Sequence, residues 1–119
     1  MKNRAQATGQ RGEAAAAEYY LRQGYRLVEQ GFRTRFGEID LILAKGEMIV
    51  FCEVKTRGPH SLDRPAASVD SRKQHKLVLA AQGWLAQHKL GDPMMRFDVA
   101  EVFPGVDGNH TINLIENAF

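Results

Sequence analysis

The chain has 119 residues, of which 44% are hydrophobic and 25% charged, and its formal net charge is +2. These values are ordinary for one globular domain with a core of its own. The single cysteine, Cys52, excludes an intramolecular disulfide and a cysteine-rich zinc site. No apolar run approaches the length that spans a bilayer, and no apolar segment follows the basic start. We therefore expect a cytoplasmic protein that makes no membrane contact.

Taken in chain order, the hydrophobic pattern predicts a helix first. Ala14, Ala17 and Leu21 have helical spacing and predict a helix from about residue 9 to 23, after a disordered stretch at 1–7. The other expected elements are strands at 25–32, 37–44, 48–55, 95–102 and 110–115, and a second helix from Ser71 to about His88. The order α-β-β-β-α-β-β predicts a single α/β domain over residues 1–119, with a mixed central sheet.

The second helix and the loop before it carry positive charge. Ser71 with Gln74 forms the pattern of a capping box, and Trp84 lies on the apolar stripe of the helix, so we expect it in the core. From Lys55 to Lys76 the chain has six Lys or Arg residues and two acids. This asymmetry favours a basic face that binds nucleic acid. A solvated loop and helix start is the alternative.

Two strands around Lys45-Gly46-Glu47 read as a tight hairpin. A turn at Lys45-Gly46 would place Glu38 opposite Glu53, and a turn at Gly46-Glu47 would place Asp40 there instead. In both registers one face is apolar near the turn and charged at the far end, where it carries Glu38, Asp40, Glu53 and Lys55 beyond Ile42 and Phe51. The other face is uniformly apolar and must be buried: Ile39, Leu41, Leu43, Val50, Cys52 and Val54.

Carboxylates that converge at one end of a hairpin repel one another, which raises their pKa values or lowers stability. A divalent cation relieves the repulsion, because Mg²⁺ takes oxygen ligands and is usually held by one or two carboxylates, waters and substrate phosphate. From the pattern alone, a salt-bridge patch in which Lys55 balances Glu53 or Glu38 is an equally good explanation.

The segments GEIDLI and FCEVKTR resemble the YraN-like family of small bacterial proteins. Those proteins are similar to the restriction-endonuclease-like, or PD-(D/E)xK, nuclease superfamily, near the archaeal Holliday-junction resolvases. The resemblance also covers GEAAAAEYYL in the first helix, SRKQHKL in the second, RFDV at 96–99 and the NAF ending. It implies a restriction-endonuclease-like fold. The Gly37-Glu38-Ile39 segment departs from the motif, which has proline before its first aspartate.

The resemblance also implies roles for individual residues. Asp40, Glu53 and the backbone carbonyl of Val54 would hold Mg²⁺ or Mn²⁺, which activates a water. Lys55 would orient or deprotonate that water or stabilise negative charge. Glu13 matches a helix-borne glutamate of resolvase-like members; the alternative is a solvent-facing glutamate near a helix N-terminus. Expected DNA contacts are Arg57, Arg64, Arg72, Lys73 and Lys76, and auxiliary candidates are Glu38 and Gln74.

We thus expect a metal-dependent DNA endonuclease, with branched or otherwise structured DNA as its partner. A homodimer is left open. Two alternatives remain: a non-catalytic nucleic-acid-binding or adaptor module that keeps the fold, and a structural protein whose acids form only a salt-bridge patch. Asp98 is expected to pair with Arg96 or to end its strand, and we assign it no catalytic role.

Overall fold

Two helices and five strands follow one another in the predicted order. The structure is a computed structural model that describes residues 4–57 and 70–119. Its elements are α1 (Arg4–Arg22), β1 (Arg26–Arg33), β2 (Glu38–Lys45), β3 (Met48–Thr56), α2 (Ser71–Gln87), β4 (Met94–Pro104) and β5 (His110–Ile115). Helix α1 begins earlier than predicted, so residues 4–7 are helical, and residues 1–3 lie outside the described part.

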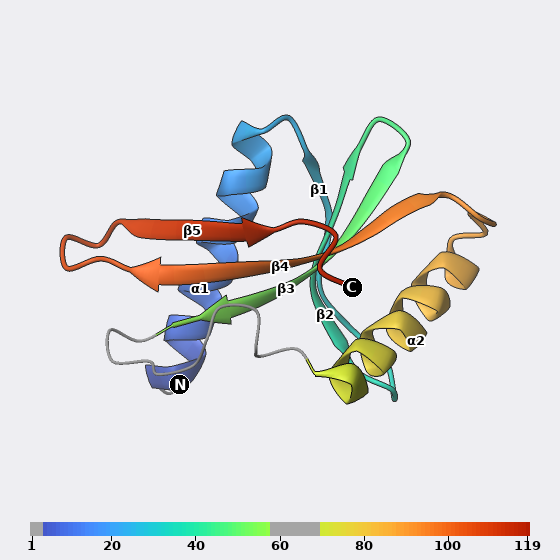
Figure 1. The fold of residues 1–119 in the computed structure, drawn as a ribbon, viewed down its shortest axis with the longest axis horizontal. Helices are drawn as coiled ribbons and strands as arrows, with labels where there is room; N and C mark the ends of the chain where they lie inside the picture. The colour runs from blue at the N-terminus through green and yellow to red at the C-terminus, as the bar shows by residue number, and fades with distance from the viewer. Residues whose placement is uncertain (1–3, 58–69) are drawn as a thin grey trace.

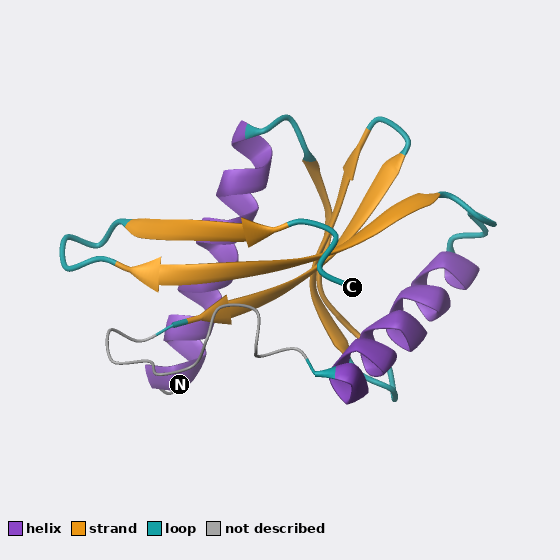
Figure 2. Cartoon of the chain, viewed as in Figure 1, coloured by secondary structure: helices purple, strands orange, loops and turns teal. Residues whose placement is uncertain are grey.

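The five strands form one mixed sheet in the order β1-β2-β3-β4-β5. Only β3 and β4 are parallel, because α2 provides the crossover that a parallel pair requires. The remaining neighbours are antiparallel. The sheet is strongly twisted, so that β1 and β2 run across the direction of β4 and β5 (Figure 1, Figure 2). The expected mixed sheet is confirmed.

Each helix covers one face of the sheet, and two core clusters result. The α1 cluster is built on Ala16, Ala17 and Tyr20 of the helix and on Leu41, Leu43, Val50, Cys52, Ala100 and Val102 of the sheet. The α2 cluster joins Leu77, Ala80, Ala81, Trp84 and Leu85 to Phe32, Ile39, Ile42, Phe51, Phe97 and Val99. The predicted core positions of Cys52 and Trp84 are confirmed, and the Trp84 indole N–H also donates to Glu29 at 3.0 Å.

The start of α2 differs from the predicted capping box. Asp70 is the N-cap, and its carboxylate accepts a hydrogen bond of 2.9 Å from the backbone N–H of Lys73. Ser71 is already the first helical residue. A carboxylate at this position both accepts from free N–H groups and favours the positive end of the helix dipole, which a serine hydroxyl does only in part.

Both helices end in the same six-residue motif. At the end of α1, Tyr25 and Gly24 donate backbone hydrogen bonds to Tyr20 and Leu21. At the end of α2 the corresponding bonds run from Leu90 to Leu85 and from Lys89 to Ala86. These are the two bonds of the Schellman motif, which needs one left-handed residue. That residue is Gly24 in α1, at φ 90°, but Lys89 in α2, at φ 54°.

We expect Lys89→Gly to stabilise the protein, because glycine adopts the left-handed conformation without the strain that a Cβ causes. The gain should be about 0.5–1 kcal/mol, measured by urea unfolding. Gly24→Ala, at the equivalent position of α1, is the mirror control and should destabilise by about 1 kcal/mol. Equal effects of the same sign at the two positions would contradict this account of the helix ends.

Candidate active site

The candidate site lies where β2 and β3 separate. The strands pair from Lys45 and Met48 at the turn to Leu41 and Cys52. This is the register of a Gly46-Glu47 turn, which aligns Asp40 with Glu53, so the Lys45-Gly46 alternative is wrong. Beyond Leu41 the Asp40 side chain replaces a backbone acceptor, and its Oδ2 accepts a hydrogen bond of 2.8 Å from the N–H of Val54.

The separation of the strands also changes which way side chains point. We predicted Ile39 on the same apolar face as Leu41 and Leu43, but Ile39 packs in the α2 cluster while those two leucines lie in the α1 cluster. Strict alternation holds only while a strand stays in a regular ladder. Because that ladder stops at Leu41, the two residues that flank Asp40 belong to opposite faces of the sheet, and Asp40 lies between the two clusters.

Asp40 is mostly buried and has other carboxylates around it. Burial, followed by the charge of Glu53, raises the pKa of Asp40 to about 7, although the hydrogen bond from Val54 acts in the opposite direction. Glu13 and Glu38 add smaller contributions that also raise this pKa. The three hairpin acids predicted to converge therefore influence one another, Glu13 adds to them from α1, and their repulsion raises the pKa of Asp40.

Glu53 is buried and pairs with two lysines from different elements. Its Oε1 lies 2.5 Å from Nζ of Lys73 on α2 and 3.3 Å from Nζ of Lys55 on its own strand. Burial, and then the neighbouring amine of Lys73, lower the pKa of Lys55. Burial is the largest single influence on Lys73 and opposes its charged form, but the hydrogen bond to Glu53, the contact with Lys55 and the charges of Glu53 and Asp40 together raise the pKa of Lys73. The two amines thus differ in how readily each loses its proton.

The salt bridge predicted for Lys55 goes to Glu53. Glu38 instead pairs with Arg33, with 3.5 Å between Arg33 Nε and Glu38 Oε2. A salt-bridge patch is therefore present, but it covers Glu53 and not Asp40. Asp40 keeps a raised pKa because it is largely removed from water and lies beside the charge of Glu53.

Glu13 reaches the sheet from α1. The side-chain amide of Gln30 on β1 donates to Glu13 Oε2 at 3.3 Å. Helix α1 begins at Arg4, so Glu13 lies in its middle, and the helix dipole does not account for it. The preceding Gly12 is buried against Thr56, where an added Cβ would lie 2.1 Å from the Thr56 hydroxyl. Glycine at position 12 thus lets α1 approach β3 closely and brings Glu13 toward Asp40.

The five residues predicted to contact DNA do not form one surface. Arg57 is buried, with its Nη2 3.4 Å from Glu101 Oε2, so its guanidinium is not presented to a phosphate at the surface. Lys73 lies on Glu53, and Arg64 falls outside the described residues. Arg72 and Lys76 are exposed on α2. The auxiliary candidate Gln74 is half-buried in the first turn of α2, and its backbone N–H bonds to Asp70.

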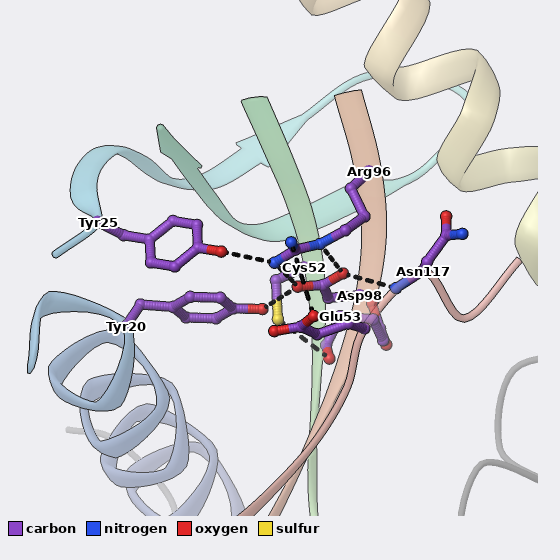
Figure 3. A network of polar contacts seen from close by, with 8 residues as sticks. Tyr20, Tyr25, Cys52, Glu53, Arg96, Asp98 and Asn117 are labelled. Carbon is purple, nitrogen blue, oxygen red and sulfur yellow. Dashed lines mark hydrogen bonds and ion pairs between the residues drawn. The ribbon is translucent and has the colours of Figure 1, made fainter. Parts of the chain in front are cut away.

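A network of polar contacts behind the site was only partly foreseen (Figure 3). The predicted pairing of Asp98 with Arg96 is confirmed and is bidentate, with both bonds at 2.8 Å. The Tyr20 hydroxyl donates to Asp98 at 2.7 Å, and the backbone N–H of Asn117 donates at 3.0 Å. Asp98 is fully buried, and in the parallel ladder it lies beside Cys52 of β3. Cys52 is the residue that precedes Glu53. The network therefore supports the strand that carries Glu53.

A cleft of about 500 Å³ lies away from the candidate site, between α1 and the β4–β5 turn, where Tyr19, Arg22 and His110 line it. Within the described ranges, no three His, Cys, Asp or Glu side chains form a group that could hold a metal ion by themselves. No helix in those ranges is long and apolar enough to cross a membrane.

The fold and the cluster define a small α/β protein with an acidic site at the split of its central sheet. The model of the uncharacterised protein family UPF0102 matches residues 12–102. The UPF0102 protein STH1475 of Symbiobacterium thermophilum is 45% identical over 111 residues, covering 93% of this chain and 94% of that protein. The UPF0102 protein HRM2_30940 of Desulforapulum autotrophicum is 40% identical over 119 residues, covering 100% and 98%. The chain belongs to the UPF0102 family, the YraN-like family that its sequence resembles.

The raised pKa of Asp40 makes a prediction for stability. Between about pH 4 and 7 the folded chain keeps a proton on Asp40 that the unfolded chain has released. The contribution of Asp40 to the free energy of unfolding therefore falls as the pH rises. Asp40→Asn keeps an acceptor for Val54 and removes the charge. We expect it to be more stable than the unsubstituted protein at pH 8, by about 1–3 kcal/mol, with the difference vanishing near pH 4.

Urea unfolding at several pH values measures this difference in the absence of divalent cations. Glu47→Gln is the control, because Glu47 is exposed at the hairpin turn and should leave the pH dependence almost unchanged. A stability of Asp40→Asn at pH 8 that equals or falls below that of the unsubstituted chain would show that Asp40 carries no repulsion.

Proposed function

We propose that this UPF0102 protein is a metal-dependent DNA endonuclease of the restriction-endonuclease-like, PD-(D/E)xK superfamily, acting in the cytoplasm. The convergence of Asp40, Glu53 and Lys55 at the split between β2 and β3 carries the proposal. The motif residues come from two adjacent strands. The raised pKa of Asp40 means that its negative charge lowers the stability of the fold, which is common at functional sites. Resemblance to resolvases favours branched or otherwise structured DNA as substrate.

The residues at the split fit a hard divalent cation. Mg²⁺ is usually held by one or two carboxylates with waters and substrate phosphate, so Asp40 and Glu53 suffice without a third acid. The carbonyl of Val54 is a third oxygen. Its N–H points at Asp40, and the N–H and C=O of one strand residue point to the same side. A bound Mg²⁺ or Mn²⁺ would lower the pKa of a water and stabilise negative charge on the phosphate.

Lys55 has the properties of the residue that acts on the water or on the phosphate. Its lowered pKa gives it a larger neutral fraction near neutral pH than an ordinary lysine has, so it is better suited to accept a proton. In its charged form it would stabilise the developing negative charge. Glu13 lies close enough to affect Asp40 and would orient water on the α1 side of the split.

The second candidate function is a DNA-binding or adaptor module without catalysis. The pairing of Glu53 with both lysines favours it, because those ion pairs neutralise the carboxylate without a metal. The two functions differ in what Lys73 does. In an enzyme, Lys73 competes with the metal for Glu53 and must leave it during binding. In an adaptor, the ion pair is a permanent part of the structure.

We expect Lys55→Ala to leave the fold and metal binding nearly intact and to lower the cleavage rate by about 100-fold or more, because one aimed charge is lost from the transition state. Asp40→Ala should abolish both metal binding and cleavage. The assay uses linear duplex, single-stranded, flapped and four-way-junction DNA with Mg²⁺ or Mn²⁺. Lys45→Ala, an exposed lysine at the turn end of the same hairpin, is the matched control and should cut normally.

Failure of the unsubstituted protein to cut any of these substrates would remove the catalytic proposal and leave the adaptor. Full activity of Lys55→Ala would do the same. Cleavage that persists in Asp40→Ala would point to a contaminating nuclease.

A separate prediction concerns Lys73 and the metal. Lys73→Met removes an ammonium group that pairs with Glu53, so Mn²⁺ should bind several-fold more tightly, as measured by calorimetry without DNA. Arg72→Met, one residue earlier and exposed, is the control and should change the affinity far less. Weaker Mn²⁺ binding in Lys73→Met would show that Lys73 supports the site and does not compete for it.

A further inference from the structure

The turn between β1 and β2 holds an aromatic ring in solvent. Phe36 is 43% exposed, and the Arg35 guanidinium lies 4.9 Å from the centroid of its ring. The turn is fixed by Thr34, whose hydroxyl accepts from the N–H groups of Phe36 at 3.0 Å and Gly37 at 3.2 Å. The backbone N–H of Thr34 also donates to the Gly37 carbonyl at 2.8 Å. The ring is therefore presented by a turn with little freedom of its own.

The turn lies along α2, where it meets further positive charge. An added Cβ on Gly37 would lie 3.4 Å from Cβ of Lys76. Arg72 is one helical turn before Lys76 on the same side of α2, and both are exposed. The Arg33 side chain is 80% exposed and pairs with Glu38, the one carboxylate at the start of β2. The turn, the strand ends beside it and the first turns of α2 thus carry four exposed cationic side chains, Arg33, Arg35, Arg72 and Lys76, together with the exposed carboxylates of Glu38 and Asp70.

This surface adjoins the candidate active site. Phe36 precedes Asp40 by four residues, so the Cα atoms of the two residues are at most about 14 Å apart. A single strand of DNA covers such a distance in a few nucleotides, so a strand bound at the split can also reach the turn.

We infer that the turn at Thr34–Gly37 is a stacking platform for an unpaired base of a single-stranded segment of DNA. The inference rests on the proposed function and extends it to the substrate. The cations suit a polyanion, and an exposed ring on a fixed turn suits a flat apolar base, which a fully stacked duplex does not present. The protein would accordingly prefer DNA that has a single-stranded segment a few nucleotides from the cut.

Binding without cleavage tests this inference. An oligothymidylate and a blunt duplex of equal length are titrated in EDTA, which prevents cleavage. We expect Phe36→Ala to weaken oligothymidylate binding about tenfold, the size of one lost stacking contact, and to change duplex binding less than about twofold. Phe36→Trp should retain binding, and its fluorescence should be quenched by oligothymidylate. Trp84, the natural tryptophan, is only 2% exposed, so its fluorescence should not change when DNA binds.

Phe103→Ala is the matched control. Phe103 is 37% exposed, comparable to Phe36, and is the second-last residue of β4. The C-terminal end of β4 points away from α2 (Figure 1). We expect it to bind both DNAs as the unsubstituted protein does. Unchanged oligothymidylate binding in Phe36→Ala, an equal loss with both DNAs, or no binding by the unsubstituted protein would overturn the platform. Because no step depends on catalysis, a platform in a protein that cuts nothing would overturn only the endonuclease, and cleavage with no role for Phe36 would overturn only the platform.

Discussion

A single buried carboxylate, Asp98, holds the fold together. An uncompensated charge in the core would cost several kcal/mol, so the chain must bring donors to it. Arg96 provides them from two residues away on the same strand, and Tyr20 on α1 and the backbone of Asn117 after β5 provide them from distant parts of the chain. Satisfying Asp98 therefore fixes α1 against the sheet and pins the segment after β5, where Phe119 stacks on Phe97. The position of Glu13 depends on α1 and hence on this network.

The half-buried carboxylate of Asp40 is treated in the opposite way. Asp98 receives a bidentate arginine and two further donors, whereas the bond from the Val54 N–H is outweighed at Asp40 by burial and by the charge of Glu53. Both acids lie in the same sheet. They differ because Asp40 lies where β2 and β3 separate, whereas Asp98 lies within reach of the Arg96 guanidinium. Lys55 and Lys73 are both held by Glu53. Asp98 is fully compensated and supports the structure, whereas Asp40 keeps the raised pKa that accompanies the proposed metal site.

Local pattern was enough to predict the element order, the mixed sheet and the shared charged face of the hairpin. It left two turn registers open, because both keep the same residues on each face. Other features depend on tertiary contacts that no local pattern encodes. The switch of Ile39 follows from the separation of β2 and β3, the approach of Lys73 to Glu53 follows from the α2 crossover, and the burial of Arg57 follows from its pairing with Glu101 on β4.

The strand order has a consequence for how the protein folds. Neighbouring strands in the sheet are also neighbours in the chain, so β1 to β5 can add to one another with short loops, apart from the α2 crossover. The bond between Tyr20 and Asp98 closes a separation of 78 residues and can form only when β4 has joined the sheet. The contact of Glu13 with Gln30 spans only 17 residues, so it can form earlier. A partly folded chain would therefore have Glu13, Asp40 and Glu53 near one another before Asp98 anchors α1, and the fixed geometry of the acidic cluster belongs to the finished fold.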